Sequence, residues 1–233
     1  MLHVTNLTVT YKGAGDAVVL GDITFSLRLG ERLALIGANG AGKSTLLLSL
    51  IGIMTPKAGE IIAGDIPVTQ ERLRDLRQLV GMVFQNPDDQ LFMPTVLEDI
   101  AFGLRNYGFD EKTIETRIDA ILGRLGIVHL KNRMSHRLSG GEKRLVALAG
   151  VLVMEPSLLL MDEPSSFLDP RARRTLITIL DDLPQTMVIA THDLDLALTL
   201  CRRTILLKQG HIFADASTTE LLHDPVLLEQ CGL

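Results

Sequence analysis

The chain has 233 residues, of which 46% are hydrophobic and 22% charged, and its formal net charge is −5. Such a composition is typical of a globular protein and excludes a disordered chain, a collagen and a disulfide-rich scaffold. The negative charge disfavours a partner such as duplex DNA, which selects basic surfaces, so we expect no nucleic-acid partner. Cys201 and Cys231 lie too far apart for a CxxC pair and favour a reducing compartment.

Membrane-crossing and secretory signals are not found in this sequence. Its longest apolar runs fall well short of the ~18 residues that cross a bilayer, and the N-terminus does not follow the pattern of a signal peptide. We therefore expect the protein to act in the cytoplasm, or on a membrane from its cytoplasmic side.

The first third of the chain is rich in predicted strands. Alternating or continuous apolar residues predict them at residues 4–9, 23–29, 31–36, 59–62 and 79–84. A glycine-rich turn at 12–16 separates the first two strands. A buried helix at 44–53 follows a glycine loop after the third strand.

The middle of the chain is predicted to be helical, from about residue 95 to 137. Between 110 and 125, Ile114, Ile118 and Ile121 recur at the spacing of one helix face. We expect residues 86–154 to form an inserted helical subdomain.

Strands and helices alternate after residue 155. Strands are predicted at 158–161 and 187–190, a helix at 170–183, and a hairpin from 205–207 to 211–213. Because strands that alternate with helices pair through crossovers, this pattern predicts an α/β fold with a mostly parallel sheet. We expect one domain over 1–233, whose core comprises 1–85 and 155–233.

A phosphate-binding loop is predicted at residues 37–44, which fit the pattern GxxxxGK[ST]. Its glycines let the backbone wrap a phosphate, and the helix that follows adds its positive end. Lys43 supplies a cation to the outer phosphates, and the Ser44 hydroxyl can ligate Mg²⁺. By chance a glycine-rich turn can match this pattern, but the expected strand before it and helix after it favour nucleotide binding.

A second acidic site is predicted where the apolar run 158–161 ends in Asp162 and Glu163. In a parallel sheet this end lies at the same edge as the phosphate loop. Asp162 would hold Mg²⁺, and Glu163, which strand alternation places on the opposite side, could polarise an attacking water. Taken alone, the pair would more often be two solvated acids at a strand end, but together with the phosphate loop it favours a metal and catalytic site.

The sequence Leu138-Ser139-Gly140-Gly141-Glu142 resembles the LSGGQ signature of the ATP-binding-cassette (ABC) ATPases. The resemblance extends over essentially the whole chain, with the motifs in the family's order. It implies a P-loop cassette fold with a RecA-like core, an antiparallel β subdomain and an inserted helical subdomain. The residues that it implies for ATP binding are Tyr11, Gly37, Ala38, Asn39, Gly40, Ala41, Gly42, Lys43, Ser44, Thr45, Ser139, Gly140, Gly141 and Asp169.

The same resemblance implies the catalytic and metal residues. Glu163, His192, Gln85 and Lys43 would take part in hydrolysis, and Ser44, Gln85 and Asp162 would hold Mg²⁺. Local structure offers a simpler interpretation of some of these residues. Tyr11 and His192 could be packing or surface residues, and Ser139 with Glu142 is also the pattern of a capping box.

The resemblance further implies that two cassettes sandwich ATP between the phosphate loop of one and the signature of the other. The partner would be a second copy or a paralogous ATPase. Glu142 departs from the family's glutamine, and we expect its carboxylate to point away from the phosphate. With Lys43, Asp162, Glu163 and His192 all present, an inactive scaffold is disfavoured.

Residues 84–92, 94–96 and 98–103 resemble the energy-coupling-factor group, which includes cobalt and nickel importers. This implies a peripheral ATPase on the cytoplasmic face of the membrane, joined to a membrane coupling protein and a membrane substrate-binding subunit. The substrate could be cobalt, nickel or a vitamin. A soluble ABC ATPase of DNA repair or translation is the other class to weigh, but no second cassette or basic arm is visible.

Overall fold

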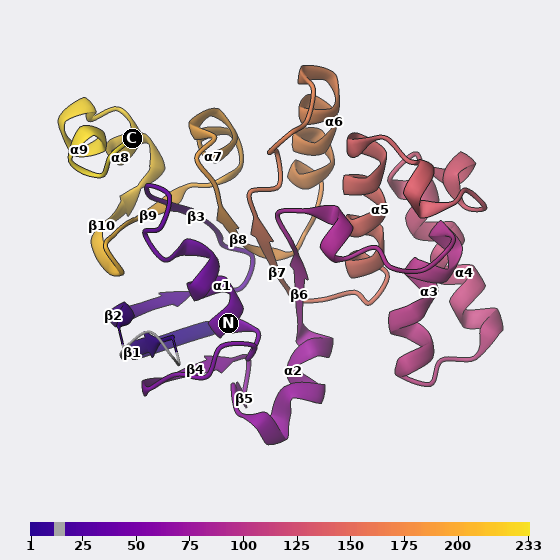
Figure 1. The fold of residues 1–233 in the computed structure, drawn as a ribbon, viewed down its shortest axis with the longest axis horizontal. Coiled ribbons are helices and arrows are strands. Elements are labelled where there is room, and N and C mark those ends of the chain that lie inside the picture. The colour runs from indigo at the N-terminus through magenta and orange to yellow at the C-terminus, as the bar shows by residue number, and fades with distance from the viewer. Residues whose placement is uncertain (12–16) are drawn as a thin grey trace.

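The computed structural model describes residues 1–11 and 17–233; the predicted turn at 12–16 lies outside them. Two sheets organise the chain (Figure 1). A four-stranded antiparallel sheet has the order β2-β1-β4-β5, and a six-stranded sheet has the order β10-β9-β3-β8-β7-β6. The strands are β1 (Leu2–Thr10), β2 (Val18–Leu27), β3 (Arg32–Ile36), β4 (Ala58–Ala63), β5 (Ile66–Pro67), β6 (Val80–Val83), β7 (Leu158–Asp162), β8 (Thr186–Ala190), β9 (Arg203–Lys208) and β10 (His211–Ser217).

The helices lie between and beside these strands, as predicted for an α/β fold. They are α1 (Lys43–Leu50), α2 (Leu73–Leu79), α3 (Val96–Asn106), α4 (Glu111–Arg124), α5 (Gly140–Leu152), α6 (Pro170–Asp181), α7 (Leu194–Leu200), α8 (Thr218–Leu222) and α9 (Pro225–Gln230). The region predicted to be helical without a break contains α3 and α4, followed by short 3₁₀ turns before α5. No helix in the described ranges is long and apolar enough to cross a membrane.

The six-stranded sheet divides the interior into two cores, because side chains alternate along its strands. From β3, Leu33 and Leu35 pack with α1 and the antiparallel sheet, whereas Ala34 and Ile36 pack on the other face with α5, α6 and α7. The central strands β3, β7 and β8 are buried almost throughout, as expected for parallel strands covered on both faces.

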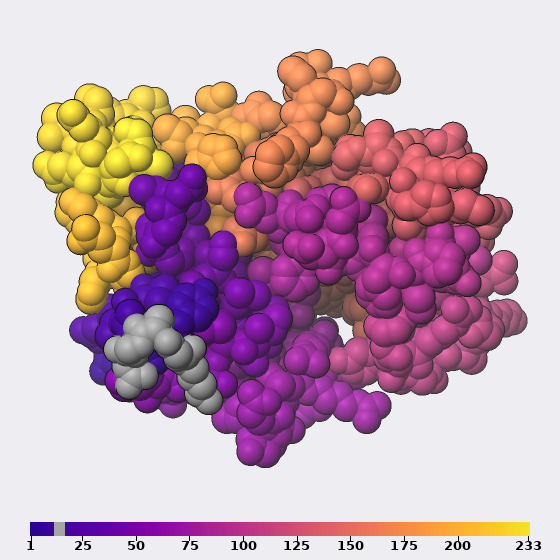
Figure 2. Space-filling model, viewed as in Figure 1, coloured from indigo at the N-terminus to yellow at the C-terminus, as the bar shows by residue number. Residues whose placement is uncertain are grey.

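The helices α3 and α4 gather at one end of the molecule, opposite α8 and α9 (Figures 1 and 2). Between these ends, β6, β7, β8 and β3 run parallel to one another. Their carboxyl ends therefore meet at one edge of the sheet, where loops that are far apart in sequence converge. Ligands of open α/β sheets bind at such an edge.

Candidate nucleotide site

The phosphate loop connects β3 to α1, as predicted. Gly42 closes the loop with a φ of +105°, a left-handed conformation that favours glycine. A Cβ at this position would lie 2.7 Å from a methyl group of Leu20, so the loop is also closely packed from behind. Lys43 is buried, and its Nζ donates to the carbonyl oxygen of Gly37 at 2.6 Å. The ammonium group is thus held over the loop that would receive phosphates.

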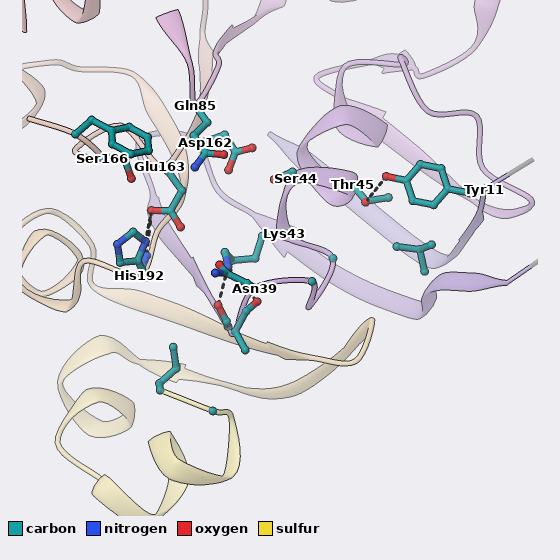
Figure 3. Close-up of a pocket in the computed structure, with 18 residues that line it drawn as sticks. Tyr11, Asn39, Lys43, Ser44, Thr45, Gln85, Asp162, Glu163, Ser166 and His192 are labelled. Atoms are coloured by element: carbon teal, nitrogen blue, oxygen red, sulfur yellow. Dashed lines mark hydrogen bonds and ion pairs between the residues drawn. The ribbon is translucent and has the colours of Figure 1, made fainter. Parts of the chain in front are cut away.

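A cavity of about 680 Å³ opens at this edge of the sheet. Figure 3 shows the side chains that converge on it from the loops after β3, β6, β7 and β8. It is lined by Tyr11, Val19, Gly37, Ala38, Asn39, Gly40, Gly42, Lys43, Ser44, Thr45, Gln85, Asp162, Glu163, Ser166, Phe167, His192, Gly232 and Leu233. The predicted residue Ala41 does not line the cavity, because its side chain is buried in the core against the antiparallel sheet.

The residues Ser44, Gln85 and Asp162 form an oxygen-rich cluster on one side of the cavity (Figure 3). Burial raises the pKa of Asp162, whereas the Ser44 side chain lowers it. The Oδ1 atom of Asp162 is buried without a hydrogen-bond partner among the described residues. A buried carboxylate oxygen without a partner, beside a hydroxyl and an amide, suits a hard divalent cation such as Mg²⁺.

The second acid, Glu163, lies in the same cavity, but not for the predicted reason. The prediction that strand alternation places it is wrong, because β7 ends at Asp162 and Glu163 has a left-handed φ of +45°. Its Oε2 lies 2.7 Å from Nδ1 of His192 and accepts a hydrogen bond of 3.2 Å from the backbone N–H of His192. The turn after β7 thus pairs the acid with the histidine that follows β8.

The side chain of Gln85 lines the cavity, and its backbone is tied to the helical segment. The buried side chain of Arg144, from α5, donates to the carbonyl oxygens of Phe84 at 2.6 Å and of Gln85 at 2.5 Å. Sequence reasoning missed Arg144, since an arginine on a helix gives no local signal of burial. It links the helix that follows Ser139 to the loop at the nucleotide cavity.

The hydroxyl of Tyr11 lies 3.1 Å from that of Thr45, on the opposite side of α1 from Asp162 (Figure 3). About 45% of Tyr11 remains exposed, so its ring is not a core residue. This placement at the rim of the cavity is compatible with a contact to a nucleotide base.

The residues Ser139, Gly140, Gly141 and Asp169 do not line this cavity. They line a separate hollow of about 650 Å³ between the start of α5 and α6. The predicted capping box is confirmed there: Glu142 Oε2 accepts from the backbone N–H and the hydroxyl of Ser139, each at 2.8 Å. The Asp169 carboxylate caps α6. The residues that the resemblance implies for ATP binding therefore line two separate hollows of one chain.

Sequence reasoning missed Val19, Gly232 and Leu233, which also line the nucleotide cavity. Ser166 and Phe167 line it too, and they belong to the segment 166–169 that the resemblance matches to the D-loop of the ABC ATPases. Only the three-dimensional arrangement of distant segments brings these residues together.

Comparisons with known proteins agree with this geometry. The family profile described as "ABC transporter" matches residues 20–166. The energy-coupling factor transporter ATP-binding protein EcfA of Methanoculleus marisnigri is 42% identical, over 100% of this chain and 85% of the relative.

Solved structures of ABC cassettes also superpose on this chain over most of its length. CbiO1 of Clostridium perfringens, part of the ABC transporter complex cbiONQ, superposes with a TM-score of 0.85 and 36% identity, over 98% of this chain and 93% of the other. A dimeric post-hydrolysis state of the cassette MJ0796, bound to ADP and Pi, superposes with a TM-score of 0.84 and 26% identity, over 94% and 99%. The fold, the phosphate loop and these similarities together show that the chain belongs to the ABC transporter family and is one of its ATPase cassettes.

Proposed function

We propose that this chain is the ATP-hydrolysing subunit of an energy-coupling-factor importer that transports cobalt or nickel ions. The observation that carries the proposal is that the phosphate loop lines one cavity, whereas Ser139, Gly140 and Gly141 line another on the same chain. A second cassette, either another copy or a paralogue, would supply the missing half. The dimeric cassette MJ0796 and the protein named EcfA support this proposal by similarity.

In the proposed mechanism the phosphate loop from 37 to 45 binds the triphosphate, and Tyr11 contacts the base. Lys43 places its cation against the outer phosphates. Ser44, Gln85 and Asp162 are the residues that would hold Mg²⁺, which when bound neutralises the charge on the phosphate oxygens.

Glu163 is the proposed base that orients the attacking water. Its Oε2 is engaged by His192, which fixes the carboxylate in the cavity. The Nε2 atom of His192 has no partner among the described residues, and the side chain is 65% exposed, so it is free to contact the γ-phosphate. Electrostatic stabilisation by such positioned groups is the main contribution of a protein to phosphoryl transfer.

The start of α5 is the proposed receptor for the γ-phosphate of the opposite cassette. Ser139, Gly140 and Gly141 present a helix N-terminus, which favours an anion, and Asp169 lies in the same hollow. Hydrolysis would remove this contact and open the dimer. Because Arg144 ties α5 to the Gln85 loop, α5 would move when ATP binds to the cavity or is hydrolysed there.

Docking to a membrane partner is proposed for the segment that follows Gln85. Phe92 and Phe102 form an edge-to-face pair at 4.8 Å, yet 63% of Phe92 and 38% of Phe102 remain exposed. An exposed aromatic pair favours burial against another protein. We propose that a membrane coupling protein covers it, which would hold the chain peripherally on the cytoplasmic face beside a membrane substrate-binding subunit.

Replacement of the proposed base tests the mechanism. Glu163→Gln should lower ATP hydrolysis by at least 100-fold and accumulate an ATP-bound dimer, measured by phosphate release and by analytical ultracentrifugation. Lys43→Ala is the control that should fail to dimerise, because it loses tight nucleotide binding. Normal hydrolysis by Glu163→Gln would contradict the role assigned to this residue.

Uptake of labelled Co²⁺, Ni²⁺ and vitamins by cells with and without the chain tests the substrate. Loss of metal uptake alone supports the proposal, whereas loss of vitamin uptake alone indicates a vitamin importer of the same group.

Purification of the chain from detergent-solubilised membranes tests whether it is a transporter subunit, because membrane proteins should then copurify with it. Copurified ribosomes or nucleic acid, without membrane proteins, would indicate a soluble ABC ATPase instead.

A further inference from the structure

The carboxylate of Asp193, which directly follows His192, joins three segments of the chain. From α6, Arg173 donates to it through Nε at 2.6 Å and through Nη2 at 2.5 Å, which makes a bidentate ion pair. From the turn after β7, the hydroxyl of Ser165 donates to Oδ2 at 2.9 Å. The backbone N–H of Leu196 donates to Oδ1 at 3.0 Å and so caps α7. Only 15% of the Asp193 side chain is exposed, so these bonds hold a largely desolvated charge.

Capping of α7 does not require the bonds from Arg173 and Ser165. Other aspartates in the described residues cap helices with carboxylates that bond only groups of the helix that each one caps: Asp110, Asp169 and Asp224. Asp193 differs because side chains from two other segments also hold it. These additional bonds fix where Asp193 lies relative to α6 and to the turn after β7.

The two segments that Asp193 and Ser165 connect also carry the proposed catalytic pair. Ser165 lies in the same turn as Glu163, and Asp193 is the next residue after His192. At the cavity, Glu163 Oε2 lies 2.7 Å from Nδ1 of His192 (Figure 3). The bond between Ser165 and Asp193 is therefore a second link between the turn of Glu163 and the loop of His192.

The contact between His192 and Glu163 needs such support. The side chain of His192 is 65% exposed, so little packing holds its ring. Arg173, by contrast, belongs to α6, which packs into the core through Leu176 and Leu180. Groups supported by a packed helix are positioned more rigidly than groups supported by loops alone. The bidentate pair thus holds the loop of His192 against a rigid element.

We propose that Arg173 and Ser165 are positioning residues for ATP hydrolysis, which act through Asp193 to hold the loop of His192 beside the turn of Glu163. The inference rests on the proposed function, because that function assigns the attacking water to Glu163 and the γ-phosphate to His192. Such groups must be held closely, since a misplacement of about 1 Å can lower a rate by about 100-fold. Arginine suits this role because its planar guanidinium reaches both carboxylate oxygens, whereas lysine donates from a single point.

Arg173→Lys tests the bidentate geometry while it keeps the positive charge. It should lower kcat for ATP hydrolysis by about tenfold, because the catalytic pair loses its fixed separation. KM for ATP should change by less than about twofold, because the phosphate loop is untouched. Ser165→Ala removes the other bond and should lower kcat by about threefold, again with little change in KM. Steady-state phosphate release measures both constants, and thermal unfolding is recorded for each chain.

The matched control is Arg203→Lys. Arg203 forms a bidentate pair of the same kind with Asp215, through Nε and Nη2 at 2.7 Å each, and its side chain is 28% exposed, against 29% for Arg173. It lies at the start of β9, at the sheet edge opposite the nucleotide cavity. Arg203→Lys should lower the melting temperature about as much as Arg173→Lys does, but leave kcat unchanged. If Arg173→Lys and Ser165→Ala both hydrolyse ATP as fast as this control, the inference is wrong.

The Glu163→Gln background separates this inference from the proposed function. There, Arg173→Lys should lower the remaining single-turnover hydrolysis by less than about threefold, because the carboxylate that it positions is gone. The full loss of about tenfold in that background would show that Arg173 acts elsewhere and would overturn the inference. If Glu163→Gln alone hydrolyses ATP at the normal rate, the proposed function is contradicted, and so is the inference that rests on it.

Discussion

Helices α3 and α5 both begin with a capping box, in which a hydroxyl residue and a glutamate three residues later bond each other's backbone. In α3, Thr95 donates its hydroxyl to Glu98 at 2.7 Å; in α5, Ser139 donates to Glu142 at 2.8 Å. The return bond from the glutamate N–H measures 3.3 Å in both helices. The two caps are thus nearly identical in local geometry.

They differ at the next two backbone N–H groups. In α3, Val96 donates to the Arg133 carbonyl and Leu97 to the Lys131 carbonyl, each at 3.0 Å. In α5, neither Gly140 nor Gly141 has an acceptor within the described residues, and a Cβ at Gly140 would meet open space. The same cap therefore completes one helix and leaves the other with two donors for an external anion. Packing, rather than the cap, makes the difference.

The largest effect is expected from Gly140→Asp, which places a carboxylate at the open donors. ATP hydrolysis should fall by about 100-fold, as when a transition-state donor is removed. The isolated chain should become more stable by about 0.5–1 kcal/mol, because aspartate suits the first turn of a helix better than glycine. Steady-state phosphate release and thermal unfolding measure the two effects.

The control for this substitution is Gly123→Ala, in α4, where a Cβ also meets open space. It should raise stability by about 1 kcal/mol and leave hydrolysis unchanged. Full activity of Gly140→Asp would show that the open end of α5 does not receive an anion, and would remove the contrast with α3.

A smaller effect is expected when the two glutamates are exchanged for glutamine. Glutamine can still accept the capping bonds, so Glu142→Gln and Glu98→Gln should each cost about 0.3–1 kcal/mol of stability, through loss of the charge at the helix N-terminus. In the Glu163→Gln background, only Glu142→Gln should tighten ATP-driven dimerisation, by about fivefold, because it removes ~1 kcal/mol of repulsion from phosphate. Equal dimerisation constants for the two variants would contradict this expectation.

The smallest effect concerns pH. The backbone N–H and hydroxyl of Ser139 hold the pKa of Glu142 below its ordinary value of 4.5. A lowered carboxyl pKa stabilises the fold above pH 4.5, and this contribution is lost as the pH falls through the folded-state pKa. The stability difference between the natural chain and Glu142→Gln should therefore shrink below pH 4.5, measured by denaturant unfolding. A constant difference at every pH would show that the bond to Ser139 adds no stability.

The motifs that could be predicted from the sequence are those formed by consecutive residues. The phosphate loop, the Ser139 capping box and the buried strand before Asp162 each depend on local spacing, and each lies where it was expected. The short helices α2, α7, α8 and α9 were not predicted. Segments of five to seven residues contain too few turns to show a clear hydrophobic period.

The tertiary structure alone decided how distant segments meet. A left-handed turn, not strand alternation, brings Glu163 to His192, and a buried Arg144 ties α5 to the Gln85 loop. Ala41 belongs to a phosphate-binding pattern but packs inward. These features depend on contacts between residues that are remote along the chain, and local periodicity carries no information about such contacts.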